Sequence, residues 1–207
     1  MRILVDIDNT CIDSNLEIIR QYREYTNDYK IPYVEKDIGW DFSPVIDSNI
    51  WDGNKITKTF SSKEFYNNVK LKNDCNYVLN KLISLGHEVI IVTKPSKNGL
   101  DLRIDFINKN IPNTSVIFLM QDNFDKSIIN GDIIIDDVLE SHKGDRKLNL
   151  LFGNYGYNND KQKKEWEKKN NKQLIRCKNW KDVLVQIEKM EDNIEMVEDD
   201  VKDNIDK

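Results

Sequence analysis

The sequence predicts an α/β fold, in which a parallel sheet has helices on both faces and a small helical cap follows the first strand. Apolar, strand-like segments alternate with amphipathic segments over residues 76–187, which is typical of parallel strands joined by helices. Several of these segments are apolar at nearly every position, as strands buried on both faces require. Residues 14–75 are instead polar and rich in aromatic residues, without a strong strand pattern. Together these observations predict a Rossmann-like sheet with an inserted cap.

The first expected strand is the apolar run at residues 3–5, close to the N-terminus. Later strands are expected at 87–93, 114–120, 132–137 and 148–153. A helix is expected before the second strand, because four apolar residues recur there at helical spacing and Gly86 stands where the helix would stop. These four residues are Val78, Leu79, Leu82 and Ile83.

The chain is therefore expected to divide into three parts. Residues 1–13 and 76–187 form the predicted core, residues 14–75 form the cap, and residues 188–207 form an acidic C-terminal tail. The tail contains nine acidic residues and three lysines, and its apolar residues recur at helical spacing. A frayed helix, an arm packed on the core and a homodimer contact all fit this pattern, and the last dozen residues also fit a disordered end.

Composition excludes several classes of protein. The longest apolar runs are far shorter than the roughly 20 residues of a membrane-spanning helix, and the N-terminal segment runs directly into Asp6, unlike a signal peptide. Cys11, Cys75 and Cys177 form no CxxC pair, which fits a reducing, cytoplasmic location. The net charge of -5 does not favour a nucleic-acid partner, and we interpret the lysine-rich segment 161–172 as a solvated helix or loop.

Polar residues stand where the expected strands end. Asp6 and Asp8 follow the first strand, Thr93 ends the second, and Asp136 and Asp137 end the strand at 132–137. In an open parallel sheet, ligands bind beyond the carboxyl ends of the strands. Clustered carboxylates repel one another unless a cation is present, and ligand sets made only of oxygen favour a hard ion, Mg²⁺ above all. Lys126, ten residues before Asp136, then adds a positive charge that suits a bound phosphate.

Two sequence stretches resemble a known superfamily. DIDNT, residues 6–10, resembles the DxDxT signature of the haloacid dehalogenase superfamily, and the order of a later Thr, a Lys and an acidic pair agrees with it. FDKSIINGDIIIDD, residues 124–137, resembles more narrowly the 5'(3')-deoxyribonucleotidase family. The resemblance implies a haloacid dehalogenase-like core, with a small helical cap after the first motif. It spans roughly residues 1–187 and is weakest in the cap.

The resemblance also implies roles for the acidic residues. Asp6 would be the nucleophile that forms an aspartyl-phosphate, and Asp8 would protonate the leaving alcohol and later activate water. The metal would be held by the Asp6 carboxylate, by the main-chain carbonyl of Asp8 and by the terminal pair. Of that pair, we expect Asp137 to bind the metal directly. Asp136 is expected to support the metal ligands or to contact the metal through a water molecule.

Phosphate would be bound by Thr93 and Lys126 in the same family. The second motif departs from the family's pattern, because Lys94 replaces the small hydroxyl residue that often follows the Thr, and Pro95-Ser96 comes next. Lys94 is a candidate phosphate contact, Ser96 is a candidate replacement for the hydroxyl, and a solvent-facing Lys94 fits equally well.

The second Asp indicates the reaction. Dehalogenases of the superfamily lack it and its ATPases usually carry Thr there, so Asp8 favours hydrolysis of phosphate esters. The resemblance implies (deoxy)nucleoside monophosphates as substrates and Mg²⁺ as cofactor. A polynucleotide or other small-molecule phosphatase would share these catalytic residues and differ in the cap. A receiver-like signalling domain has its acidic groups before the Thr and Lys, which is a different order, and a non-catalytic phospho-binding module would not need every catalytic residue type.

Six aromatic residues of the cap could either fill its core or stack on a nucleobase. We expect most of them to be core residues. Trp40 and Phe65 are the candidates for substrate binding, because they flank the most irregular segments of the cap. The six are Trp40, Phe42, Trp51, Phe60, Phe65 and Tyr66.

Overall fold

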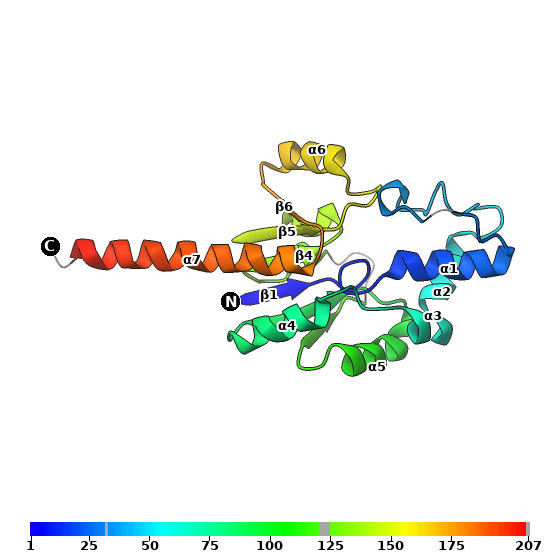
Figure 1. The fold of residues 1–207 in the computed structure, drawn as a ribbon, viewed down its shortest axis with the longest axis horizontal. Coiled ribbons are helices and arrows are strands. Elements are labelled where there is room, and N and C mark those ends of the chain that lie inside the picture. The colour runs from blue at the N-terminus through cyan, green and yellow to red at the C-terminus, as the bar shows by residue number, and fades with distance from the viewer. Residues whose placement is uncertain (32, 121–124, 206–207) are drawn as a thin grey trace.

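The protein contains one sheet of six parallel strands in the order β3-β2-β1-β4-β5-β6 (Figure 1). The computed structural model describes residues 1–31, 33–120 and 125–205, with side chains to residue 193. The strands are β1 (Arg2–Val5), β2 (Glu88–Thr93), β3 (Ser115–Phe118), β4 (Ile133–Asp136), β5 (Leu148–Phe152) and β6 (Ile175–Cys177). Because β1 lies between β2 and β4, the polar residues that end these three strands meet at one edge.

Helices join the strands and cover the sheet, as the alternating sequence pattern predicts. The α-helices are α1 (Ser14–Thr26), α2 (Gly53–Phe60), α3 (Lys63–Asn68), α4 (Cys75–Ser84), α5 (Leu100–Asn110), α6 (Asp160–Asn170) and α7 (Trp180–Ile205). Short 3-10 helices are η1 (Glu35–Asp37), η2 (Lys97–Gly99), η3 (Lys126–Ile128) and η4 (Leu139–Lys143). The short strand β6 was not predicted, since three residues carry too little pattern to identify a strand.

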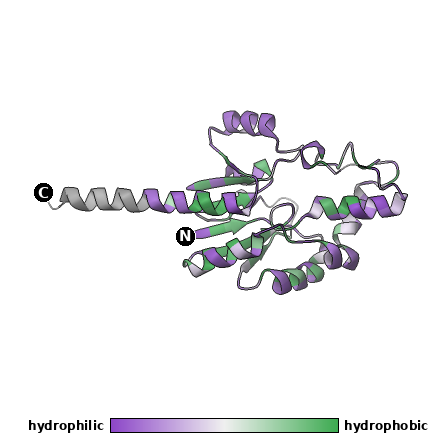
Figure 2. Cartoon of the chain, in the orientation of Figure 1, coloured by the Kyte–Doolittle hydropathy of each residue, from purple (hydrophilic) through white to green (hydrophobic). Residues whose placement is uncertain are grey.

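The central strands are buried on both faces, which explains their unbroken apolar sequences. Ile3 pairs with Val89 on one side and with Ile133 on the other. Ile3 and its neighbour Leu4 are both fully buried, although successive side chains of a strand point to opposite faces. In Figure 2 the strand next to the N-terminus, β1, is mostly hydrophobic. The α/β fold expected from the sequence, a parallel sheet with helices on both faces, is confirmed.

Two layers of helix complete the core. The face that carries Ile3 and Val5 packs in one cluster with buried side chains of α4, α5 and α7, among them Trp180. The opposite face carries Leu4 and is packed against residues next to η3, while α6 places Trp166 against Leu151 of β5. Burial of apolar side chains on both faces is the main stabilising contribution to such a sheet.

Residues 14–75, which we call the cap, lie at the carboxyl edge of the sheet and contain α1, α2 and α3 (Figure 1). The side chain of Asp52 caps the start of α2 and that of Ser62 caps α3, so short sequence signals begin both helices. Trp51 packs against two tyrosines of α1, and Phe65 packs between Phe60 and Tyr66. Aromatic rings thus form most of the interior of the cap.

The chain enters and leaves the cap through two segments that pair with each other. Ile12 and Leu71 form an antiparallel bridge. The Asp13 amide donates to the Lys70 carbonyl at 2.9 Å, and the Lys72 amide donates to the Cys11 carbonyl at 2.8 Å. All six strands lie within residues 1–13 and 76–187, while the division into core, cap and tail stays a prediction.

The C-terminal segment continues α7 as one helix to Ile205 (Figure 1). Its first half packs on the core, where Lys81 Nζ lies 2.8 Å from a carboxylate oxygen of Glu188 and His87 lies 3.1 Å from Glu191. The expected homodimer contact falls mainly on residues 194–207, whose side chains lie outside the described part. Within the described residues, the helices are all too short or too polar to cross a membrane.

Candidate active site

The chain after β1 turns sharply and presents two carboxylates. The Asp6 amide donates to the Ile135 carbonyl at 2.9 Å, so the pairing of β1 with β4 continues one residue past the strand. Asn9 then takes a left-handed conformation with φ of 55°, which Asn tolerates better than most residues. The amides of Cys11 and Ile12 both return to the Ile7 carbonyl. This compact turn fixes Asp6 and Asp8 at the edge of the sheet.

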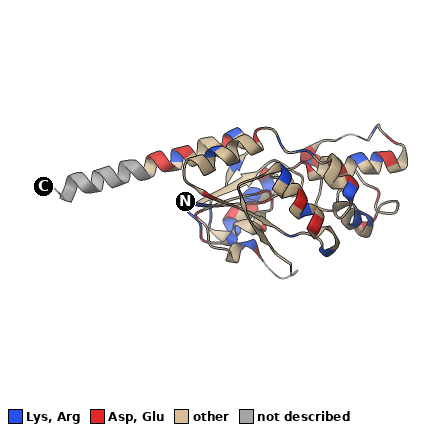
Figure 3. Ribbon diagram, turned by 90° about the horizontal axis from the view of Figure 1, so that it is seen from below, with Lys and Arg blue, Asp and Glu red and all other residues tan. Residues whose placement is uncertain are grey.

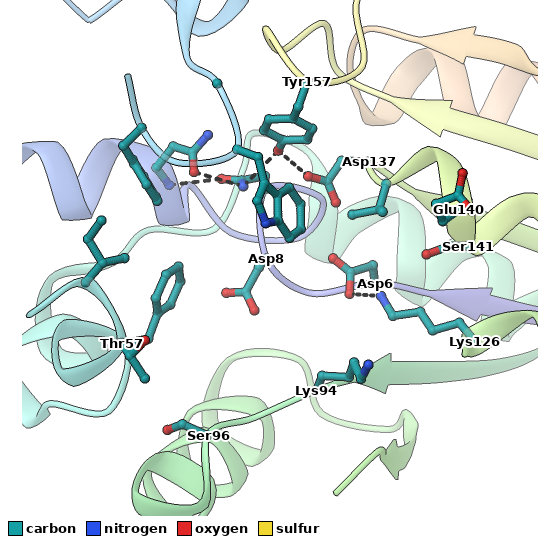
Figure 4. A pocket seen from close by; sticks show the side chains of 18 of the residues that line it. Asp6, Asp8, Thr57, Lys94, Ser96, Lys126, Asp137, Glu140, Ser141 and Tyr157 are labelled. Carbon is teal, nitrogen blue, oxygen red and sulfur yellow. Dashed lines mark hydrogen bonds and ion pairs between the residues drawn. The ribbon is translucent and has the colours of Figure 1, made fainter. Parts of the chain in front are cut away.

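Three buried carboxylates converge at this edge. Asp6, Asp136 and Asp137 each place one carboxylate oxygen within 4.8 Å of the other two. Lys126 contacts two of them, with Nζ bonded to Asp6 and 2.7 Å from Asp136 Oδ2. Figure 4 shows the Lys126 side chain directed at Asp6, with Asp137 on the other side of Asp6. The cluster therefore contains three acids and one base.

Burial and mutual repulsion change the proton affinities of this cluster. Burial raises the pKa of Asp6 to about 7, with Asp136 and Asp8 adding to the rise and Lys126 opposing it. Burial, together with the charges of Asp6 and Asp136, also raises the pKa of Asp137 well above its ordinary value. Burial alone would lower the pKa of Lys126, but Asp136 and Asp6 raise it. The cluster thus lacks positive charge, and its all-oxygen donors suit a hard divalent cation.

The two acids at the end of β4 differ in how their oxygens are engaged. Asp136 accepts from Lys126 at one oxygen and from the Val138 amide, at 2.8 Å, at the other. Asp137 accepts at Oδ2 from the Tyr157 hydroxyl, and its Oδ1 accepts no hydrogen bond from the residues that the structure describes. Asp137 therefore retains an oxygen that could bind a metal, whereas both oxygens of Asp136 are occupied.

Asp8 is held by two donors that the sequence analysis did not identify. Ser14 Oγ donates to Asp8 Oδ1 at 2.7 Å, and Arg103 Nη1 donates to Asp8 Oδ2 at 2.7 Å. Arg103 also donates to the Thr93 hydroxyl. Thr93 is fully buried and does not line the pocket described below. Its hydroxyl, which we expected to contact phosphate, is therefore not exposed to that pocket in this structure.

A pocket of about 710 Å³ lies between the core and the cap. Asp6, Asp8, Asp137, Lys126 and Arg103 line its core wall. The cap wall is largely apolar, and Figure 4 shows Thr57 facing Asp8 across the pocket. Its residues are Trp40, Phe42, Ile56, Thr57 and Phe60. A polar wall beside an apolar wall is typical of a site for a small amphipathic ligand.

The candidate substrate-binding residues of the cap have different positions. Trp40 lines the pocket and is 69% exposed, so its position allows the expected contact with substrate, which stays a prediction. Phe65 is 0% exposed and does not line the pocket, because it belongs to the aromatic interior of the cap. Phe42 and Phe60 pack in the core as expected, and both also line the pocket. Sequence spacing contains no signal that separates these rings.

The two candidates for contact with phosphate in the loop after β2, Lys94 and Ser96, both line the pocket. The Ser96 hydroxyl also bonds to the Ser61 hydroxyl of the cap. The loop after β2 thus contributes an ammonium group and a hydroxyl group on the side of the pocket opposite Tyr157 (Figure 4).

Tyr157 is a further site residue that the sequence analysis did not identify. Its hydroxyl donates to Asp137 and accepts from Asn9 Nδ2 at 3.1 Å. Its ring stacks on Tyr155 and meets the edge of Trp40, with ring centres 5.3 and 5.4 Å apart. Tyr157 therefore touches both a carboxylate of the acidic cluster and the exposed aromatic ring of the cap.

Comparison with known proteins identifies the family. A family model described as 5' nucleotidase, deoxy (pyrimidine), cytosolic type C protein matches residues 1–191. The chain belongs to this 5'-nucleotidase family. It is accordingly a phosphoric monoester hydrolase of the 5'-nucleotidase type, as the resemblance implied. A comparison with curated proteins finds no match.

Solved structures agree on the fold. A haloacid dehalogenase-like hydrolase from Streptococcus pneumoniae is 14% identical with a TM-score of 0.58, over 90% of this chain and 97% of that chain. A haloacid dehalogenase-like protein from Agrobacterium tumefaciens (13% identity, TM-score 0.57) and a predicted phosphatase from Clostridium acetobutylicum (13%, 0.57) each match over 91% of this chain and 98% of their own. At these identities the likeness shows the shared fold.

Proposed function

We propose that the protein is a cytoplasmic, Mg²⁺-dependent phosphatase that hydrolyses (deoxy)nucleoside monophosphates through an aspartyl-phosphate. The observation that carries the proposal is the pocket itself, in which Asp6 and Asp8 face an apolar, partly aromatic cap wall. A phosphate group fits the charged wall and a nucleobase fits the aromatic wall. The membership in the 5'-nucleotidase family supports the same substrate class, and three free cysteines fit the cytoplasm.

Asp6 is the proposed nucleophile. One of its oxygens is bonded to Lys126, which fixes the carboxylate and offsets the repulsion between it and a phosphate dianion. Attack by Asp6 forms an oxygen–phosphorus bond and breaks the ester bond to the nucleoside. Asp8 gives a proton to the leaving oxygen, and the same residue then takes a proton from the water that hydrolyses the aspartyl-phosphate.

The residues around Asp6 fit a divalent metal ion. We propose that Asp6, Asp137 and the main-chain carbonyl of Asp8 hold it, because Asp137 retains a carboxylate oxygen without a hydrogen bond from the described residues while Asp136 is engaged at both oxygens. When bound, Mg²⁺ neutralises the negative charge of the carboxylates and of the transferring phosphoryl group. Lys126 and Lys94 supply further positive charge along the same pocket.

The test is phosphate release with Mg²⁺ from a panel of substrates. The panel contains deoxynucleotides, ribonucleotides, sugar phosphates and an oligonucleotide with a 3' phosphate. Asp6→Asn is expected to lower kcat on nucleotides by on the order of 10⁴-fold or more, because the amide is not a nucleophile. Asp132→Asn is the matched control, since Asp132 precedes the opposite end of β4 and should leave kcat unchanged.

The outcomes separate mechanism from substrate. Release that requires Asp6 and is abolished by EDTA supports the proposed mechanism. Release mainly from the oligonucleotide keeps that mechanism and replaces the substrate class. No release that depends on Asp6 from any member of the panel overturns the proposal.

A further inference from the structure

We propose that Arg103 is a positioning residue for Asp8, and that it couples the placement of the cap to proton transfer at the leaving oxygen. The inference rests on the proposed function, because it assigns Arg103 to the step that Asp8 performs. Nothing in the sequence motifs points to Arg103, which lies in the middle of α5.

Arg103 is a buried arginine whose side-chain hydrogen bonds go to residues around the site. Only 2% of the residue is exposed, yet it lines the pocket. Nη1 donates to Asp8 Oδ2 at 2.7 Å and also to the Thr93 hydroxyl, while Nε donates to the Tyr66 hydroxyl at 2.8 Å. A buried guanidinium has a rigid, planar set of donors, so these bonds fix its orientation and that of the groups it contacts.

Asp8 is consequently held by one residue of the core and one residue of the cap. Arg103, from core helix α5, binds one carboxylate oxygen, and Ser14, the first residue of cap helix α1, binds the other. Tyr66, from cap helix α3, binds the same guanidinium. The direction of the Asp8 carboxylate therefore depends on how the cap lies against the core. A general acid must lie within hydrogen-bond reach of the leaving oxygen, so this direction controls proton transfer.

A direct role of Arg103 in binding phosphate is the competing explanation. Two of its nitrogens already donate to three protein oxygens, and little of the side chain is exposed to a ligand. Lys94 and Lys126 line the same pocket and carry the positive charges that we propose for binding phosphate. The geometry therefore favours a contact with Asp8 over a contact with substrate.

The leaving group distinguishes these roles. Arg103→Met keeps an unbranched, apolar side chain and removes the guanidinium donors. We expect kcat/KM on a deoxynucleoside monophosphate, whose alkoxide needs a proton, to fall on the order of 10²-fold. p-Nitrophenyl phosphate releases a stable anion without a proton, so its kcat/KM should fall by less than about threefold. The comparison uses kcat/KM because this constant ends with formation of the aspartyl-phosphate, whereas kcat also includes the water step in which Asp8 acts on either substrate.

Further variants keep the test decisive if Arg103→Met does not fold. Tyr66→Phe removes only the bond to Nε, and Ser14→Ala removes only the bond to Asp8 Oδ1. Each should lower kcat/KM on the nucleotide by roughly three- to tenfold and spare kcat/KM on p-nitrophenyl phosphate, because formation of the aspartyl-phosphate from this ester needs no proton from Asp8. Arg2→Met, which breaks an exposed ion pair with Glu88, is the matched control and should change kcat/KM on neither substrate. Melting curves for all variants exclude general unfolding.

Two results would overturn the inference. Equal losses of kcat/KM on both substrates, with a raised KM, would make Arg103 a phosphate ligand. Unchanged kcat/KM in folded Arg103→Met, Tyr66→Phe and Ser14→Ala would leave Arg103 no role in the reaction. Failure of the proposed function looks different, because the unmodified protein would then release no phosphate from either substrate in an Asp6-dependent way.

Discussion

The two walls of the pocket are built by different means. The core wall consists mainly of charged side chains at or near strand ends, together with Arg103 of α5. Lys126 of this wall is bonded to Asp6 and to the fully buried Asp136. The cap wall consists largely of apolar side chains from loops and short helices, and Trp40 is 69% exposed. The difference indicates that the sheet positions the acidic groups, whereas the wall that we propose for substrate recognition belongs to a separate segment of the chain.

The sheet positions the reacting groups through its hydrogen bonds. Val5 pairs with Ile135, and the next residues of the two strands are Asp6 and Asp136. Any shift of β4 against β1 would move one carboxylate away from the other and bury the wrong side chains, so the register is strongly specified. Along the helices, in contrast, basic and acidic residues are interspersed (Figure 3).

Removal of Lys126, the base that contacts both Asp6 and Asp136, should have the largest effect. Lys126→Met leaves buried carboxylates without their partner, and we expect kcat to fall about 10²–10³-fold. In metal-free buffer at pH 8 the free energy of unfolding should decrease by about 3–5 kcal/mol, as for other broken buried ion pairs. Kinetics on nucleotides and denaturant unfolding measure both. Lys147→Met, at an exposed pair with Asp132, is the control and should change little.

If Lys126→Met and Lys147→Met changed kcat and the free energy of unfolding equally little, the buried charges of the core wall would not be needed. That result would contradict the contrast drawn between the two walls.

A cap variant should affect binding more than chemistry. Trp40→Ala is expected to raise KM for nucleotides by roughly 5- to 100-fold, since stacking on a base contributes about 1–3 kcal/mol. The change in kcat, and in KM for a sugar phosphate, should be small. Tyr29→Ala removes an aromatic ring of the cap that is exposed outside the pocket, and it should leave KM unchanged. A fall in kcat at constant KM for Trp40→Ala would mean that the cap wall takes part in the chemistry.

The smallest expected effect is the change of thermal stability with pH and with Mg²⁺. The pKa of Asp6 rises from 3.8 to about 7 on folding, so the native state binds this proton more tightly, and the stability of the metal-free protein should fall as pH rises from about 4 to about 7. Mg²⁺ binds the ionised carboxylates, so it should raise Tm by roughly 2–4 °C more at pH 8 than at pH 6. Differential scanning fluorimetry measures the shift.

Asp6→Asn should lose the part of this pH dependence that Asp6 contributes, while Asp137, whose pKa burial also raises, should keep its own part. A Mg²⁺ shift of the same size at both pH values would mean that the acidic cluster does not hold the metal.

The sequence predicted the sheet and the acidic residues because both depend on short, local patterns. Apolar runs identify the buried strands, and residues such as Asp6 and Asp136 directly follow them, so their neighbourhood is set by topology alone. Arg103 and Tyr157 could not be predicted in this way. One lies inside a helix and the other in a loop, and each reaches the site only through the packing of its element.

The positions of the aromatic residues in the cap are even harder to predict from the sequence. Trp40 and Phe65 have the same kind of sequence environment, yet one ring lines the pocket and the other is the centre of the cap interior. Which face a ring takes depends on how α2 and α3 meet the core, and no short-range pattern specifies that contact.

The paired segments at the base of the cap have a consequence for the evolution and engineering of the protein. Because Ile12 and Leu71 lie side by side, the entire cap leaves and rejoins the core at one point. An insert whose ends already meet adds no strain to the sheet when its length or sequence changes. A cap from a relative with another substrate could therefore be joined at these two residues while Asp6, Asp136 and Asp137 stay in place. The new cap would have to supply partners equivalent to Ser14 and Tyr66 for Asp8 and Arg103.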